Sequence, residues 1–166
     1  MSYDYSGLLS VVVSSTLVNQ LDLSNIADII GDTGYRYNQA LANGKGSGKA
    51  QAHWHDRRTL AESASEDLDL SALPGPHGTV KFTALKVIIV RVATETAGAK
   101  ISVGPASATP FAEVSATLGP NGILPVGNPV DGWTVTANTN DLLKVANTGT
   151  GPVTYDIVLI GEGSIT

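Results

Sequence analysis

The chain has 166 residues, of which 42% are hydrophobic, and it contains 18 glycines and 8 prolines but no cysteine. This length is typical of one compact domain, and the lack of cysteine excludes disulfides, thiolate nucleophiles and thiolate metal sites. The formal net charge is −5, and the 10 basic residues are scattered singly or in pairs, which excludes the basic stripe that a nucleic-acid ligand requires.

The first apolar segment, residues 8–18, is rich in valine, leucine, serine and threonine, which favour an extended strand over a helix. Its hydroxyl side chains and its length make it too polar and too short to span a bilayer, and no basic region of a secretory signal precedes it. We therefore expect a first strand here, no membrane partner, and a chain that is made in the cytoplasm.

The next segment, residues 21–31, fits two structures. Ser24 could cap a short helix that Gly31 would end, whereas the alternation of leucine and aspartate at residues 21–23 suits a strand. Both alternatives stay open.

A boundary is predicted near residue 43. Residues 35–41 alternate between aromatic or apolar and polar side chains, and the glycine- and lysine-rich run that follows is typical of a linker. We predict an N-terminal arm that acts as an assembly element at residues 1–43, a flexible linker at residues 44–50, and a β-sandwich domain at residues 51–166.

The body of the chain is read as short strands separated by turns. Residues 51–60 and 64–70 look like paired strands, and residues 79–93 contain the longest apolar run. In that run Leu85, Val87 and Ile89 would share one face, and both faces are largely apolar, as in a central strand. Further strands are expected at residues 100–103, 123–126, 132–137, 142–146 and 153–160. The pattern predicts an all-β fold, an antiparallel β-sandwich or jelly-roll-like domain with an N-terminal arm.

Two stretches, residues 54–70 (WHDRRTLAESASEDLDL) and 140–161 (NDLLKVANTGTGPVTYDIVLIG), resemble small structural proteins of tailed bacteriophages, including capsid decoration or cement proteins with a jelly-roll-like body. The resemblance covers the last two-thirds of the chain. It implies a virion location at the capsid surface, synthesis in the host cytoplasm, binding to the major capsid protein, and a homo-oligomer with a trimer favoured. The second stretch also has the pattern of a β-hairpin around a Gly-Thr turn.

Candidate metal ligands cluster in residues 53–56. His53 and His55, two residues apart on a strand, point the same way and could share a metal ion. A third ligand would have to be Asp56, which faces the other way, or His77, which lies in a Pro-Gly loop. We expect a half-exposed strand here, with no metal and no cofactor.

The catalytic motifs in the sequence are incomplete. The run from Gly44 to Ala50 is similar to a phosphate-binding loop, but its first glycine would fall on Asn43 and Ala50 replaces the required hydroxyl. The tripeptide that begins at Asp32 matches aspartic proteases, although Asp32 is expected to start a turn, and no G-x-S-x-G elbow is present. We therefore expect no enzyme.

An acidic run and two tryptophans complete the candidate sites. The run, which we expect to be a solvated strand edge rather than a cation site, comprises Glu62, Glu66, Asp67 and Asp69. Trp54 and Trp133 could be glycan-stacking platforms, but buried packing is the expectation for both. The sequence thus favours a non-enzymatic virion protein that decorates or cements the capsid, and the alternative is a head-fibre or tail-associated adhesin with a glycan-binding β-sandwich.

Overall fold

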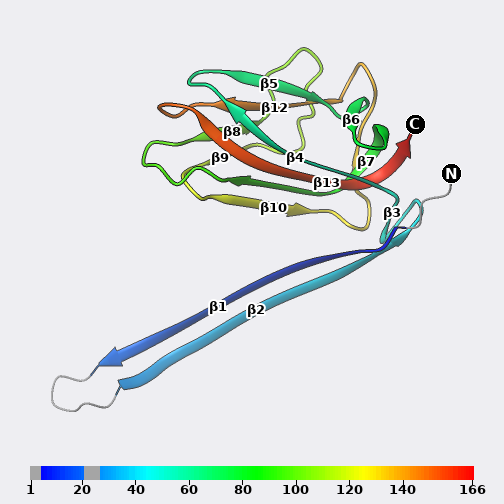
Figure 1. The fold of residues 1–166 in the computed structure, drawn as a ribbon. Coiled ribbons are helices and arrows are strands. Elements are labelled where there is room, and N and C mark those ends of the chain that lie inside the picture. Colours follow the sequence, from blue (N-terminus) through cyan, green and yellow to red (C-terminus); the bar gives the residue numbers. More distant parts are fainter. Residues whose placement is uncertain (1–4, 21–26) are drawn as a thin grey trace.

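The computed structural model describes residues 5–20 and 27–166, and over these ranges the chain forms strands, turns and loops without a helix (Figure 1). No helix in the described ranges is therefore long and apolar enough to cross a membrane. Two sheets pack face to face as an antiparallel β-sandwich, from which a long hairpin projects. The all-β prediction is confirmed, whereas the jelly-roll connectivity stays a prediction.

The larger sheet has six strands. Its main path is antiparallel and runs in the order β10 (Ile123–Gly127), β7 (Gly78–Val92), β13 (Val153–Ile165) and β4 (Ala52–Leu60). Two short strands, β6 (Leu73–Gly75) and β11 (Trp133–Thr134), pair with other parts of β7. The predicted central strand at residues 79–93 is confirmed, because β7 lies between β10 and β13.

The smaller sheet has four antiparallel strands in the order β5 (Ser65–Asp69), β12 (Leu142–Asn147), β8 (Ile101–Gly104) and β9 (Ala116–Leu118). The core fills the space between the two sheets. Along β13, for example, Tyr155, Ile157 and Leu159 are buried, while the residues between them are half-buried on the opposite face. This period of two is what a strand covered on one face by a second sheet requires.

Two predicted hairpins are wrong. Residues 51–60 and 64–70 do form strands, but β4 pairs with β13 in the larger sheet and β5 pairs with β12 in the smaller one. Likewise β12 and β13, which flank the Gly-Thr turn, lie in different sheets. Asn147 lies where the two connections meet, and the two N–H groups of its side-chain amide lie within hydrogen-bond distance of the carbonyl oxygens of Leu60, Ala61 and Gly151. These bonds satisfy carbonyls that a hairpin ladder would otherwise pair.

A bulge changes the facing of residues within β7. Ile160 pairs with Val87 but Gly161 pairs with Leu85, so Lys86 is an additional residue in β7 at this point. As a result Leu85 belongs to the core between the sheets, whereas Val87 belongs to a second cluster on the other face of the larger sheet. The prediction that Leu85 and Val87 share a face is therefore wrong.

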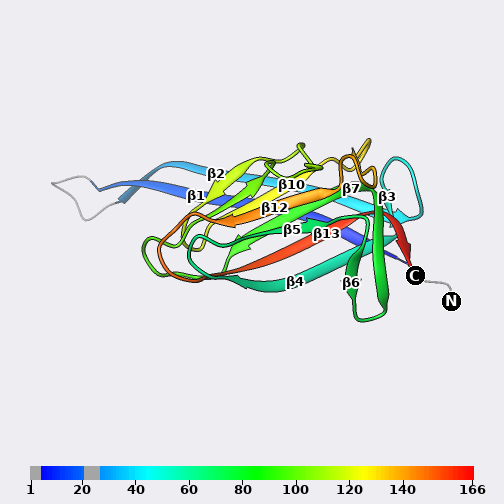
Figure 2. The same ribbon diagram turned by 90° about the horizontal axis from the view of Figure 1, so that it is seen from above.

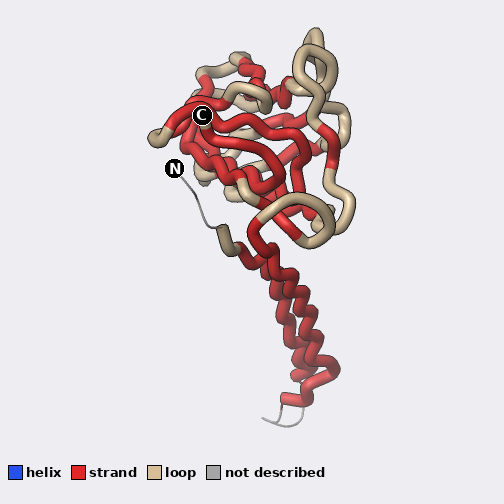
Figure 3. Tube along the Cα trace, turned by 90° about the vertical axis from the view of Figure 1, so that its right-hand side faces the viewer, coloured by secondary structure: helices blue, strands red, loops and turns tan. Residues whose placement is uncertain are grey.

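The hairpin consists of β1 (Gly7–Gln20) and β2 (Ala27–Asn43), and β3 (Lys49–Ala50) runs parallel to the end of β2. The hairpin leaves the body near β3 and extends away from the body, as Figures 1 and 3 show. Seen from above, the hairpin passes behind the body and reaches beyond it (Figure 2). The predicted strand at residues 8–18 is confirmed.

Three predictions on the second hairpin strand have different outcomes. Of the ambiguous segment at residues 21–31, residues 27–31 belong to β2 and residues 21–26 lie outside the described residues. Asp32 pairs with Thr16 within the hairpin, so the prediction that it starts a turn is wrong. The alternating pattern at residues 35–41 does lie in a strand.

Candidate interaction surface

The face of the hairpin that is turned towards the body becomes more exposed along its length. Leu9 and Leu41 are buried, Val11 and Tyr37 are half-buried, and Val13 is 55% exposed. These side chains share one face, because alternate residues of a strand point the same way and the pairing of β1 with β2 is regular here. We call this face the inner hairpin face.

The opposite face of the hairpin is also partly apolar. Leu8 is 66% exposed and Val12 is 57% exposed, and Ser10 between them donates to the Oδ1 of Asn38 across the ribbon at 2.7 Å. Within residues 7–14 and 36–43 the only charged side chain is that of Arg36. A two-stranded ribbon with a single charged side chain over this stretch and apolar residues on both faces has little of the charge by which a solvent-exposed strand is usually kept soluble.

The root of the hairpin packs on the larger sheet. Leu9, Leu41 and Ala50 form a buried cluster with Val87, and Ile160 is among the half-buried residues that pack around it. These contacts lie on the face of the sheet that is turned away from the core, which we call the outer sheet face. The hairpin is therefore joined to the body by an apolar contact as well as by the chain itself.

A buried ion pair reinforces this junction. Lys86 is fully buried; its Nζ lies 3.2 Å from Oε1 of Glu162 and donates to the carbonyl oxygen of Val130 at 3.0 Å. The same carboxylate oxygen accepts a bond from the backbone N–H of Gly46 at 2.8 Å. Lys86, the additional residue in β7, thus links β7 and β13 to the segment between hairpin and body through Glu162.

That segment forms a turn in which Gly44, Gly46 and Gly48 have positive φ angles, a conformation that side chains with a Cβ rarely adopt. Gly48 also donates its N–H to the carbonyl oxygen of Pro129 at 2.9 Å. The turn leads through β3 into β4, and no helix follows it as a phosphate-binding loop would require. The division into arm, linker and body stays a prediction.

The outer sheet face continues beyond the root. Strand pairing places Pro125, Ile89 and Val158 in one row across β10, β7 and β13, and we call these three residues the apolar row. Pro125, together with Val126 and Gly127, also lines a groove of about 400 Å³ whose other wall is formed by Leu9, Val11 and Tyr37 of the hairpin.

The next row of the outer sheet face is charged. It runs from Ile123 of β10 through Arg91 and Asp156 to Arg57, and Nε of Arg57 donates to Oδ1 of Asp156 at 2.6 Å. The hydrogen bond and the charge of this guanidinium lower the pKa of Asp156. The apolar part of the outer sheet face is therefore a band bounded by the hairpin root on one side and by an ion pair on the other.

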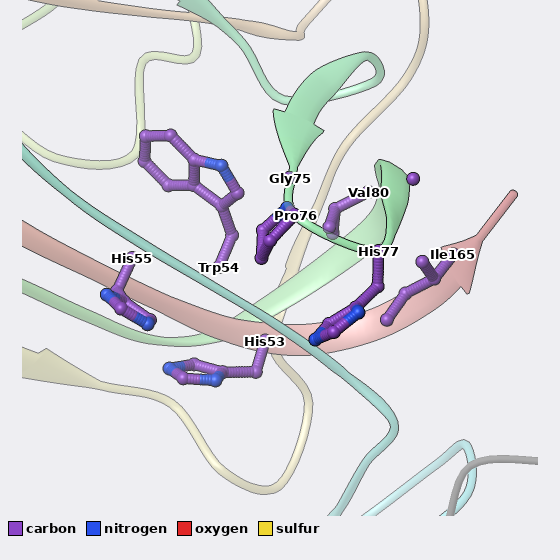
Figure 4. A pocket seen from close by; sticks show the side chains of 9 residues that line it. His53, Trp54, His55, Gly75, Pro76, His77, Val80 and Ile165 are labelled. Carbon is purple, nitrogen blue, oxygen red and sulfur yellow. The ribbon is translucent and has the colours of Figure 1, made fainter.

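Three histidines meet in a second pocket, which has a volume of about 280 Å³ (Figure 4). His53 and His55 stack with their ring centroids 5.2 Å apart, and His77 reaches the same pocket from the turn between β6 and β7. Burial, and then the charge of His55, lower the pKa of His53. Among the described residues no group of three histidines or carboxylates is placed to hold a metal ion.

The sequence offered His77 as a possible third ligand beside His53 and His55, and the structure brings it to the same pocket. Its Pro-Gly context was the available signal, since a tight turn between two strands returns the chain to the sheet from which it left. The geometry of the three rings nevertheless offers no metal-binding arrangement in this part of the structure.

The tryptophans lie inside or against the core. Trp54 is 4% exposed, and its indole Nε1 donates to the carbonyl oxygen of Pro74 at 2.8 Å, so the packing prediction is confirmed for it. Trp133 is half-buried and packs against the main core. Neither ring has the fully open face that a stacking sugar would need.

The acidic run is only partly a solvated edge. Glu66 accepts from Nε of Arg58 at 2.6 Å and from the hydroxyl of Tyr155 at 2.8 Å, and it lies at the rim of the core. Burial, and then this carboxylate, raise the pKa of Tyr155. Asp69 accepts from the backbone N–H of Ser71 at 2.9 Å, as a turn residue does. Glu66 and Asp69 are thus structural, whereas Glu62 and Asp67 are exposed, with Oδ1 of Asp67 4.0 Å from Nζ of Lys144.

The uncovered apolar hairpin with its root groove is thus the surface of this chain that is best suited to bind another macromolecule. Comparison of the chain with models of protein families, with curated protein sequences and with solved structures finds no match.

Proposed function

We propose that this chain is a non-enzymatic structural protein of a tailed-phage virion, which decorates or cements the capsid by binding major capsid subunits and by associating with its own copies. The observation that carries this proposal is the projecting hairpin. The hairpin is suited to binding rather than to catalysis, because it presents apolar side chains on both faces and reaches well beyond the body (Figure 3).

A hairpin of this kind favours a role in assembly for an energetic reason. Two strands alone are at best marginally stable in water, and Leu8, Val12 and Val13 gain nothing from burial in the isolated chain. Burying one such side chain against a partner contributes about 1.5–3 kcal/mol. A partner surface would therefore stabilise the ribbon and the complex at once, and many copies would add these contributions over a whole capsid.

The phage and capsid part of the proposal depends on the resemblance of residues 54–70 and 140–161. These residues lie in the body, where they include much of β4 and β5 and the whole of β12. The resemblance thus concerns the sandwich, whereas the argument for assembly concerns the hairpin. A trimer at the capsid surface is the arrangement that we favour.

The adhesin alternative has less support. A glycan-binding sandwich needs aromatic rings that are open to solvent, and Trp54 is 4% exposed while Trp133 is half-buried against the core. An enzyme is not favoured either, because the histidine pocket brings no carboxylate or nucleophile together with its imidazoles.

The test is a chain with a shortened hairpin. Replacing residues 12–36 with an Asn-Gly turn removes the projecting part and keeps Leu9 and Leu41 on the sheet, so the body is left covered as before. We expect the variant to melt cooperatively near the temperature of the intact chain, to be monomeric by light scattering, and to be missing from phage particles in which the intact chain is present.

Two results would contradict the proposal. One is a shortened chain that enters particles, or associates with itself, as well as the intact chain does. The other is a particle preparation from the producing phage in which mass spectrometry finds no copy of the intact chain.

A further inference from the structure

The hairpin and the outer sheet face both carry apolar side chains that one chain leaves uncovered. On the inner hairpin face, exposure rises from buried Leu9 to Val13, which is 55% exposed. On the outer sheet face the apolar row lies just beyond the root, and Ile123 at the sheet edge is 58% exposed. Each of the two surfaces needs a cover of aliphatic character.

The existing root contact indicates what the outer sheet face accepts. Leu9 and Leu41 of the hairpin already pack on Val87 there, and Ile89 and Ile160 line the same cluster. Ile89 belongs both to this cluster and to the apolar row. The uncovered band is therefore a direct continuation of a contact between this sheet and this hairpin.

The chain's own hairpin does not cover that band, because the ribbon diverges from the body towards its tip (Figure 1). The groove lined by Leu9, Val11, Tyr37 and Pro125 is the narrow end of the space between them. The divergence leaves the distal hairpin free to reach another molecule while its root stays bound.

On the basis of the function proposed above, we propose that the hairpin's partner is a second copy of this chain. The distal inner hairpin face of one copy lies on the outer sheet face of the next, with Val11 and Val13 against the apolar row and Ile123. Reciprocal exchange between two copies gives a symmetric dimer, and passing the hairpin onward around a closed ring gives the favoured trimer.

The net charge of the chain predicts how self-association depends on salt. Each copy has a net charge of −5, so copies repel one another at long range, while the apolar row itself carries no charge and only Arg91, the cross-strand partner of Ile123, adds a charge at its edge. Salt screens the repulsion and leaves apolar burial intact. Self-association is therefore expected to strengthen as the salt concentration rises, whereas an interface built on ion pairs would weaken.

The absence of cysteine from the chain makes a direct test possible. A Val13→Cys chain is mixed with a differently tagged Ile123→Cys chain under mild oxidation, and a disulfide forms only where the two Cβ atoms approach within about 4 Å. We expect a disulfide-linked pair of the two different chains. As a control, Val13→Cys is mixed with Ser65→Cys, an exposed residue of β5 in the smaller sheet, and no linked pair is expected.

The possible outcomes separate the candidate partners. Linked pairs of two Val13→Cys chains in preference to the mixed pair would mean that hairpins pair with each other, and would overturn the proposal. A double Val13→Cys, Ile123→Cys chain that links internally and stays monomeric would mean that the hairpin closes on its own sheet, and would overturn it as well.

A second pair of variants provides an equilibrium measurement. Val13→Asp and Ile123→Asp each place a charge in the band, and each is expected to weaken self-association by at least roughly tenfold without changing the melting of the monomer. If shortening the hairpin abolishes self-association but Ile123→Asp does not, the site on the sheet is wrong and the proposed function stands. If shortening has no effect, the proposed function itself fails.

Discussion

The sandwich body and the projecting hairpin are both antiparallel β-structure, yet they are stabilised in different ways. In the body, side chains from two sheets bury one another, so that residues such as Ile88, Leu143 and Leu159 are fully buried. In the described part of the hairpin, only Leu9 and Leu41 are buried, and both lie at the root. The hairpin has ladder hydrogen bonds but no second layer.

The difference shows that strand pairing alone does not stabilise a region. Backbone hydrogen bonds replace bonds to water and contribute little net free energy, whereas the removal of apolar side chains from water is the main favourable term in folding. The body completes that burial within one chain, whereas Leu8, Val12 and Val13 of the hairpin stay more than half exposed. Substitutions of the same kind in the two regions should therefore have different consequences.

The largest contrast is expected between two leucines. Leu143→Ala in the core should lower the free energy of unfolding by about 2–5 kcal/mol, because it leaves a cavity between the sheets. Leu8→Ala on the hairpin, where the side chain is 66% exposed, should change it by less than about 0.5 kcal/mol. Urea unfolding at a concentration where the chain is monomeric measures both. Equal losses would show that the hairpin is buried within one chain.

A somewhat smaller effect is expected at the junction of the two regions. Lys86→Met leaves the carboxylate of Glu162 without its cation, and breaking a buried pair costs about 3–5 kcal/mol. Because Glu162 keeps its bond from Gly46, we expect the lower end of this range, together with faster cleavage by trypsin at Lys45 and Lys49. The measurements are urea unfolding and mapping of the first cleavage sites.

The control for this junction is the double variant Lys86→Met, Glu162→Gln. Replacing both charges removes the unpaired carboxylate, so the double variant should recover part of the lost stability. A single variant as stable as the parent, or unchanged cleavage at the two lysines, would show that the ion pair does not hold the hairpin root.

Two asparagines offer a matched comparison of intermediate size. Asn147→Ala removes donors to three carbonyls at the rim of the sandwich and should cost about 2 kcal/mol. Asn38→Ala removes one exposed hydrogen bond to Ser10 in the hairpin and should cost less than about 0.5 kcal/mol. Thermal melts of the two variants side by side decide the matter, and a reversed order would contradict the role assigned to Asn147.

The smallest expected effect concerns pH. The pKa of His53 in the folded chain lies below its ordinary value of 6.5 because of burial and the neighbouring charge of His55. Between the folded and unfolded values the unfolded chain binds more protons, so the free energy of unfolding falls as the pH drops from about 6.5. The ring of His77 lines the same pocket.

Melting temperatures of the intact chain and of His53→Gln, recorded between neutral and mildly acidic pH, test this direction. The variant should lose less stability on acidification than the parent does. A parent whose stability rises on acidification would contradict the lowered pKa of His53.

Much of the fold followed from local patterns. The strand-favouring composition of residues 8–18, the apolar run in residues 79–93 and the turn cluster before residues 153–160 predicted strands at these three places. The burial of Trp54 followed from the frequency with which such rings pack in cores. Turn-rich composition and the absence of helical period were sufficient for the all-β class.

The pairing of these strands was decided by tertiary structure. A short turn between two strands usually makes a hairpin, but β4 and β5, and also β12 and β13, pass from one sheet to the other, and Asn147 bonds to the carbonyls at the rim where they cross. The bulge at Lys86, which turns Val87 towards the hairpin, depends on the register of β7 against β13. Neither feature has a local signature, since each depends on residues far apart in the chain.

The candidate interaction surface was likewise predicted in part by the sequence and decided in part by the tertiary structure. The sequence by itself determined that residues 8–18 form an apolar strand without a charged side chain. Only the tertiary structure decided that this strand pairs with residues 27–43 in a ribbon whose root is buried on the outer sheet face and whose distal part is not. The physical reason is that composition sets how much apolar surface a segment carries, whereas the path of the whole chain sets which of that surface remains in contact with water.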